Sequence, residues 1–279
     1  MEIGEGFSAA VIVGALEVSR SFVHKVLARK KKDKKVMSMD KKQDEKLIKT
    51  IRELISQYPQ YGYRKIYAIV RFRMGFKVYR NKVYDIMKSQ RLLLPPSTRN
   101  KTLFRGVKMS LNLEAQRPNQ LWGVDMTQIW CGNDGWGYLH AVIDHFDKTL
   151  LGYNYSTSCK AIGAVMAISE AASRRPVKEL ELRSDNGCHY GAKIFREELT
   201  RLGINHTRTM VNTPKGNAVI ERFFRSLKQE CVWLHKFENF EQSKEVIDKW
   251  IREYNEERPH QSLDYATPAE FYLEKVSGI

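Results

Sequence analysis

The chain has 279 residues, with 47 Lys and Arg against 32 Asp and Glu, and a formal net charge of +15 at pH 7. Residues 1–110 hold 26 basic and 9 acidic side chains, a net of +17, which leaves −2 for residues 111–279. A segment this basic predicts a nucleic-acid partner, because every phosphate contact releases condensed counterions. The apolar run 7–16 is too short to span a bilayer, so we do not expect it to be a transmembrane helix. A membrane surface is therefore a weaker interpretation of the partner than nucleic acid.

The cysteines and the lack of a recognisable targeting signal indicate in which cellular compartment the protein is expected. Cys131, Cys159, Cys188 and Cys231 have neither the spacing of a metal finger nor that of a disulfide framework. We expect four reduced thiols in a cytoplasmic protein of a bacterium, associated with the nucleoid and with no membrane partner.

The first segment, residues 1–35, predicts two short helices and a basic linker. Ser19 is suited to cap the second helix, which offers Arg20 and Lys25. One interpretation is a helix-turn-helix whose second helix enters a DNA major groove. A helical hairpin without groove contacts fits the segment equally well. The lysine-rich run 29–35 is expected to be a solvated linker.

The next segment, residues 36–94, predicts a helical DNA-binding domain. Apolar residues at helical spacing indicate helices over 40–58, 61–70 and 79–89, the first ended by Pro59. Its candidate DNA contacts are Arg64, Lys65, Arg80 and Lys82. A double proline then opens an extended linker, residues 95–117.

After residue 118 the pattern changes to strands. Alternating side chains predict a strand over 121–130, and strands over 137–146 and 150–157 complete a three-stranded meander. Further elements are expected in the order helix, strand, helix, strand, helix: 160–174, 179–183, 192–202, 204–209 and the segment from 217. This order predicts an α/β core with five strands over residues 118–235, followed by a helical extension, 236–279.

Three acids in the core have the pattern of a metal-dependent nuclease. Asp125 lies in the first strand among apolar residues, where an unpaired carboxylate is costly. Asp185 ends the fourth strand before an Asn-Gly turn, and Glu221 follows 35 residues later on an amphipathic helix, on one face with Asn217. We expect the three to meet at the sheet's edge. Crowded together without a cation, at least one should titrate high.

Such a site suits phosphoryl transfer. Two divalent ions about 3.5–4 Å apart neutralise the attacking and leaving oxygens and hold them in line. Carboxylate oxygens are the ligands that Mg²⁺ prefers. Two other acids have blander interpretations: Asp144 as a supporting or turn residue, and Glu170 as a solvent-facing one. Lys215 and Lys228, which flank the helix of Glu221, are further candidate DNA contacts.

Six phrases of the chain together resemble one known family. They are Trp122–Ile129, Trp136–Asp144, Arg183–Gly187, Asn217–Glu221 with Leu227–Glu230, Tyr254–Asn255 with Arg258–His260, and Thr267–Pro268. They resemble a retroviral-type integrase core, and more narrowly the second-frame (OrfB-type) transposases of bacterial insertion sequences of family three. The phrase Tyr61–Arg64 and the helix after it extend the likeness into the N-terminal helical region.

The resemblance implies an RNase H-like core with a mixed sheet, and a DDE-type polynucleotidyl transferase with Asp125, Asp185 and Glu221 as the catalytic and metal-binding triad. It implies two Mg²⁺ ions per site, with Mn²⁺ also supporting activity. The resemblance also implies that the DNA partners are the terminal inverted repeats and the target. In the reaction that it implies, hydrolysis exposes a 3′-hydroxyl that attacks another phosphodiester, and a circular intermediate precedes insertion. Two ends must be joined, so at least a homodimer is expected.

The chain departs from the family pattern at a few positions. Cys188 and His189 stand where Ser and Gln are usual, and Gly216 stands where an acid is frequent. The family's longer fused product also carries an extra helix-turn-helix and zipper, and this chain has no heptad run. The chain is therefore either complete in a shorter design or dependent on a partner that supplies those parts.

Two other function classes compete. A nuclease of the same fold would cut without joining, although it does not need the basic N-terminal module. A DNA-binding regulator with an inert core would bind without any change in its DNA.

Overall fold

The computed structural model describes residues 41–95, 115–209 and 217–277. The helix-turn-helix expected in residues 1–35, with Arg20 and Lys25, lies outside the described residues, and so does Lys215. The chain divides into two compact units, residues 1–57 and 58–279, and each is considered by itself.

In the first unit, the described part is one helix, α3 (Lys41–Gln57). Leu47, Ile51 and Leu54 recur at helical spacing and are buried. The helix expected over 40–58 is therefore confirmed.

The second unit begins with short helices, as expected, but the first is not regular. Helix α4 (Tyr63–Ala68) passes directly into a π-helical turn, Ile69–Arg73, and α5 (Arg80–Ser89) follows. Val83 and Met87 turn the apolar side of α5 inward, where they are fully buried.

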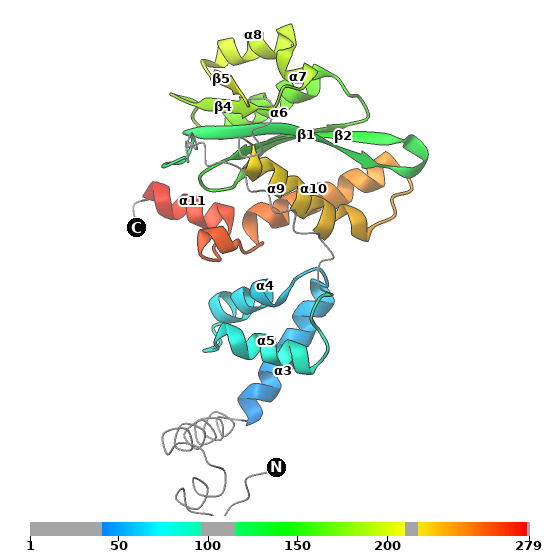
Figure 1. Ribbon diagram of the computed structural model, residues 1–279, viewed down its shortest axis with the longest axis vertical. Coiled ribbons are helices and arrows are strands. Elements are labelled where there is room, and N and C mark those ends of the chain that lie inside the picture. Colours follow the sequence, from blue (N-terminus) through cyan, green and yellow to red (C-terminus); the bar gives the residue numbers. More distant parts are fainter. Residues whose placement is uncertain (1–40, 96–114, 210–216, 278–279) are drawn as a thin grey trace, which may run out of the picture. The chain divides into compact units, whose positions relative to one another are not determined.

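The core of this unit is a five-stranded mixed sheet (Figure 1). Its strands are β1 (Leu121–Trp130), β2 (Trp136–Asp144), β3 (Leu150–Ser156), β4 (Glu181–Ser184) and β5 (Asn205–Arg208). The spatial order is β3-β2-β1-β4-β5, with β1 in the middle. The pairs β1–β2 and β2–β3 are antiparallel, whereas β1–β4 and β4–β5 are parallel. The expected meander and the two later strands are confirmed.

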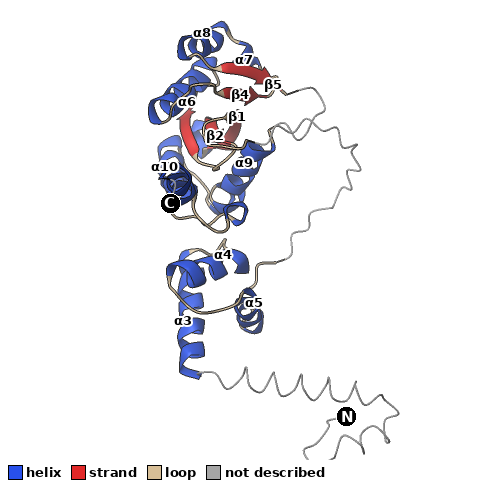
Figure 2. Ribbon diagram, turned by 90° about the vertical axis from the view of Figure 1, so that its left-hand side faces the viewer, coloured by secondary structure: helices blue, strands red, loops and turns tan. Residues whose placement is uncertain are grey.

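Helices cover both faces of the sheet, as Figures 1 and 2 show. One face carries α6 (Ala161–Arg174), α7 (Cys188–Gly191) and α8 (Lys193–Leu202). The other carries α9 (Ala218–Glu230) and α10 (Phe240–Glu256), and α11 (Pro268–Ser277) ends the described chain. Short 3₁₀ turns lie at Gly132–Asp134, Val232–Leu234 and Gln261–Leu263. Three antiparallel strands extended by two parallel ones, with helices on both sides, form the RNase H-like core that the resemblance implies.

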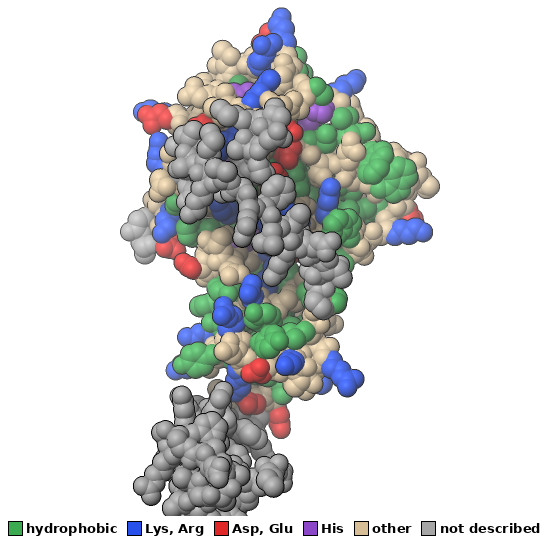
Figure 3. Space-filling view, in the orientation of Figure 1, with side chains coloured by type: hydrophobic (Ala, Val, Ile, Leu, Met, Phe, Trp, Pro, Cys, Tyr) green, Lys and Arg blue, Asp and Glu red, His purple; other side chains and the backbone are tan. Residues whose placement is uncertain are grey.

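Alternation along β1 divides its side chains between two hydrophobic clusters. Trp122 and Val124 pack with residues of α6 and α8, whereas Ile129 packs with residues of α9 and α10. Helix α6 approaches β3 so closely that a Cβ at Gly152 would collide with the backbone of α6, which explains the glycine. The β1–β2 turn instead exposes an apolar surface (Figure 3), where Trp130 and Trp136 pack edge to face.

Candidate active site

The central strand places Asp125 under the helix that carries Glu221. Asp125 pairs across the ladder with Ala141 of β2 and, by strand alternation, shares the face of Ile129, which packs against α9. Its side chain is half-buried, and the Met126 N–H donates a 2.8 Å hydrogen bond to Oδ1.

Asp185 follows directly after β4, the parallel neighbour of β1. The register pairs Leu121 with Glu181 and Gly123 with Arg183, so its continuation leads from Asp125 to Asp185. The side chain is exposed, and Oδ1 accepts a 2.8 Å bond from the Gly187 N–H. The Asn-Gly turn predicted after this strand thus orients the carboxylate. We expected the acids to meet at the sheet's edge. Asp125 and Asp185 do not lie on an edge strand, because β1 and β4 are inner strands of the sheet.

Glu221 lies in the first turn of α9, whose start is attached to β1 beside Asp125. The Asn217 Nδ2 donates to the Val124 carbonyl at 3.3 Å. An added Cβ on Gly123 would lie only 2.9 Å from Asn217 Oδ1, so the absence of a side chain there leaves room for this contact. Asn217 and Glu221 are four residues apart and share a helix face, as expected. The hydrogen bond from Asn217 to β1 therefore clamps the start of α9 and sets which way Glu221 faces.

The electrostatics connect the three acids. Burial raises the pKa of Asp125 to about 7, and the negative charges of Asp185 and Glu221 add to the increase, while the Met126 N–H and Lys228 oppose it. The expectation that one carboxyl titrates high is confirmed, although burial is the larger cause. This arrangement favours an arriving cation, which would offset both the burial and the repulsion.

As a metal site, the three acids have suitable donors. Their oxygens are the hard ligands that Mg²⁺ takes. Among the residues that the structure describes, however, no three His, Cys, Asp or Glu side chains are grouped closely enough to hold a metal ion.

Sequence reasoning missed two buried groups near these acids. Tyr190 is buried on α7, its pKa is raised by burial and then by Asp125 and Asp185, and its hydroxyl has no hydrogen-bond partner in the described part of the chain. His145 points its Nε2 at the space over Gly123, 2.6 Å from where a Cβ would stand. Neither has a local sequence signal, because both depend on contacts between distant segments.

The two acids with blander interpretations are structural. Asp144 is fully buried at the end of β2, where its carboxylate accepts the Asn119 and Phe146 N–H groups and the Trp122 indole N–H. It is therefore a turn residue. The solvent-facing role expected for Glu170 is wrong, because Glu170 accepts a 2.7 Å bond from the Tyr153 N–H and is only part-exposed.

The family comparisons divide the chain as its fold does. An integrase core domain model matches residues 115–214, a second integrase core domain model matches 202–268, and an HTH-like domain model matches 42–100. The two integrase core matches together span more than half of the chain. The chain belongs to the integrase-core transposases. Among curated relatives, transposase InsD for insertion element IS2 of Escherichia coli is 26% identical over 290 residues, covering 98% of this chain and 94% of the relative. The IS2 transposase on the F plasmid matches to the same extent.

Solved structures that resemble this transposase include retroviral integrases. A simian T-cell lymphotropic virus intasome in complex with PP2A regulatory subunit B56 gamma has a TM-score of 0.49 at 16% identity, covering 80% of this chain and 74% of that one. The catalytic core of BIV integrase has a TM-score of 0.44 at 23% identity, covering 57% and 97%. The HTLV-2 integrase core in complex with magnesium, in its trimeric form, has 0.43 at 18%, covering 57% and 99%.

The candidate DNA contacts differ in what surrounds them. Arg64 and Arg80 of this transposase are exposed and Lys82 is half-buried, in a region whose surface shows Lys and Arg side chains (Figure 3). Lys65 instead forms a 2.6 Å ion pair with Glu230 of α9. Lys228 is half-buried and close enough to Asp125 to lower its pKa.

The described helices include none that is both long and apolar enough to cross a membrane. All four cysteines are free thiols, as expected, with Cys131 and Cys231 buried.

Proposed function

We propose that this transposase cuts at the ends of its own insertion element and transfers the exposed 3′-hydroxyl to another phosphodiester, with Asp125, Asp185 and Glu221 as the catalytic acids. Membership of the integrase-core transposases makes the chain a polynucleotidyl transferase of an insertion element. The observation that carries the finer proposal is the shared electrostatic field of these three acids, which come from two neighbouring strands and one clamped helix.

Each acid has a distinct part in the proposed site. Asp125 and Asp185 each keep one carboxylate oxygen bonded to a backbone N–H, which orients the other oxygen. Glu221 completes the set from α9, and Asn217 holds that helix against β1. Bound Mg²⁺, or Mn²⁺ in its place, would neutralise charge on the attacking and leaving oxygens, and we propose two ions for each site.

The DNA partners follow from the same proposal. The HTH-like domain and the basic N-terminal segment would bind the terminal repeats, and the core would also meet the target duplex. Because two ends are joined, we propose at least a homodimer, acting on DNA at the bacterial nucleoid through a circular intermediate. The domain boundaries expected from the sequence, 1–35, 36–94, 95–117, 118–235 and 236–279, remain predictions.

The test is a cleavage and joining assay on a plasmid that carries the DNA flanking this gene, with Mg²⁺ or Mn²⁺. We compare the full chain with Asp185→Asn and Glu221→Gln. The matched control is Glu241→Gln, because Glu241 is also an exposed acid in the first turn of a helix. We expect joined or circular products from the wild type and the control, and a loss of at least 100-fold in both acid variants.

Three outcomes would contradict the proposal. Joined products from Glu221→Gln would remove Glu221 from the mechanism. Nicks without joining would indicate a nuclease, and bound but unchanged ends would indicate a regulator.

A further inference from the structure

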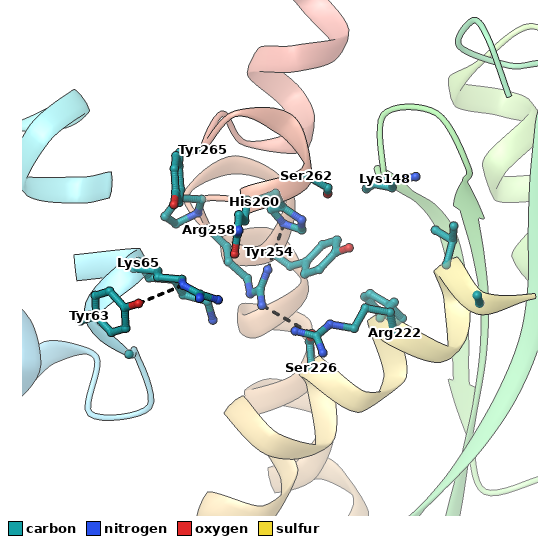
Figure 4. Close-up of a pocket in the computed structure, with 17 residues that line it drawn as sticks. Tyr63, Lys65, Lys148, Arg222, Ser226, Tyr254, Arg258, His260, Ser262 and Tyr265 are labelled. Carbon is teal, nitrogen blue, oxygen red and sulfur yellow. Dashed lines mark hydrogen bonds between the residues drawn. The ribbon is translucent and has the colours of Figure 1, made fainter. Parts of the chain in front are cut away.

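A basic pocket lies against a face of α9 different from the one that carries Glu221. It has a volume of about 750 Å³ and is formed by α4, α9, the segment 258–265 and the β2–β3 turn (Figure 4). All of these belong to the unit 58–279. Helix α9 turns by about 100° per residue, so Ala218, Arg222 and Ser226 form one stripe, while Asn217 and Glu221 face another direction. The pocket and the acids therefore lie on different faces of α9, about 120° apart around the helix axis.

Among the described residues, the lining of this pocket is basic and contains no carboxylate. Five cations line it: Arg64, Lys65, Lys148, Arg222 and Arg258. Glu230 lies behind the wall and pairs with Lys65 and Arg258, so one negative charge is set against five positive ones. Within the described residues, exposed Arg222 makes no hydrogen bond or ion pair. The pocket therefore has surplus positive charge and an available guanidinium.

The titration of the pocket's own groups agrees with that surplus. Burial and then the charge of Arg258 lower the pKa of Lys65 to about 8, in spite of its pair with Glu230. Burial, Arg258 and Lys65 hold the pKa of His260 well below its usual range, so the imidazole is neutral. A bound anion would relieve this repulsion.

Aromatic rings line the same pocket. Tyr63 and Tyr265 are half-buried and line the pocket from α4 and from the segment after Leu263, and buried Tyr254 lines it from α10 (Figure 4). The Tyr265 ring is also stacked on Phe72, with the ring centroids 5.9 Å apart. Cations beside aromatic rings suit a nucleotide, because the phosphate meets the charges and the base stacks on a ring. A pocket of this volume admits a nucleotide but not a duplex.

Tyr265, which lines the pocket, has a strained backbone conformation. Its φ is +71°, and Asp264 before it has a φ of +51°, both in the left-handed region. A bulky side chain rarely adopts this conformation, and such strain is concentrated at functional sites. Hydrogen bonds from the Tyr265 and Ala266 N–H groups to His260 and Leu263 hold the turn.

We propose that this pocket binds one unpaired nucleotide of the DNA on which the transposase acts, with its phosphate on Arg222 and its base against Tyr265. The identity of the ligand as DNA rests on the proposed function. The pocket would hold a strand beside the reacting phosphodiester, on another face of the helix that carries Glu221.

The test is binding of fluorescent DNA to the full chain, measured by anisotropy in EDTA so that no strand is cut. The probes are a blunt hairpin duplex, the same hairpin with a short 3′ single-stranded extension, and that extension with abasic sites. Arg222→Gln should weaken binding of the extended hairpin about 10-fold and of the blunt one less than about 2-fold. The control is Arg196→Gln on α8, an exposed arginine away from the pocket that removes the same charge.

A second variant tests the base. Tyr265→Gly relieves the positive φ and removes the ring together with its contacts to Tyr67 and Phe72, and we expect it to abolish the preference for the extension over its abasic form. Circular dichroism melting checks that each variant is folded. Equal losses on blunt and extended DNA, or no greater loss from Arg222→Gln than from Arg196→Gln, would overturn the proposal. An inactive wild type that still discriminates the extension would refute the proposed reaction and leave the pocket standing.

Discussion

Asp125 and Glu230 are both carboxylates largely removed from water, and their acidities move in opposite directions. The pKa of Asp125 rises to about 7, whereas that of Glu230 falls to about 2. Burial pushes both upward and is the largest single influence on each. The partners of each carboxylate decide the difference.

The carboxylate of Glu230 is paired with two basic side chains from distant parts of the chain. Arg258 donates to both of its oxygens, at 2.7 and 2.8 Å, and Lys65 donates at 2.6 Å. Within the described part of the chain, the Asp125 carboxylate accepts one hydrogen bond, from a backbone N–H, and the charges of two other acids act on it against that of Lys228. A buried acid that the chain leaves uncompensated indicates a functional site, whereas a compensated one holds segments together.

The largest effect on stability should come from removing the compensated acid. Glu230→Gln leaves Lys65 and Arg258 partly buried without a counter-charge, so we expect the free energy of unfolding to fall by about 3 kcal/mol. Urea unfolding of the full chain at pH 7 measures it, with exposed Glu238→Gln as the matched control. Adding Lys65→Gln to Glu230→Gln should cost less than the sum of the single changes. A loss under about 1 kcal/mol would show that the three charges are not coupled.

Removing the uncompensated acid, Asp125, should instead raise the free energy of unfolding, and only at a pH where its carboxyl group is ionised. Because the pKa of Asp125 is raised, the folded chain holds this proton more tightly than the unfolded chain, so the group's contribution to stability falls as pH rises from about 4 to about 7. Asp125→Asn removes that titration. We expect the variant to exceed the wild type by about 2 kcal/mol at pH 8, less than the full shift implies because the carboxyl is partly solvated, and to match it at pH 4.

Urea unfolding at the two pH values in EDTA measures this difference. Added Mg²⁺ should narrow it at pH 8 by stabilising only the native wild type. The same difference at both pH values would show that Asp125 is not the titrating group.

The smallest effect is expected at an exposed ion pair. Lys249 and Glu253 are 3.8 Å apart on α10, and the side chain of Lys249 is 72% exposed. Water already solvates the Lys249 charge, so Lys249→Gln should change the free energy of unfolding by less than about 0.5 kcal/mol. Comparison with Glu230→Gln in the same urea titration separates burial from the mere presence of an ion pair. An equal loss in both variants would contradict that separation.

Local pattern predicted most of the elements of this fold. The first strand was expected over 121–130 and has those bounds, and turn residues follow it. Short irregular pieces were missed. Helix α7 has four residues, too few for a helical period, and the π-helical turn after α4 has the apolar spacing of an ordinary helix.

For the site, the sequence indicated which acids to consider but not what supports them. Asp125, Asp185 and Glu221 as catalytic residues remain a prediction, and so do the DNA contacts. Lys65 shows why the contacts resist prediction: its ion-pair partner is 165 residues away in sequence. The amide of Asn217 on the β1 carbonyl and the hydroxyl of Tyr190 likewise depend on how distant segments pack, which periodicity does not encode.

The three acids also differ in how much side-chain conformational entropy each would lose on binding a ligand. The carboxylates of Asp125 and Asp185 are each tethered by a 2.8 Å bond from a backbone N–H, so part of their rotational entropy was surrendered when the chain folded. Glu221 is exposed and forms no side-chain hydrogen bond among the described residues. Any ligand that contacts all three therefore bears the cost of side-chain ordering mainly at Glu221.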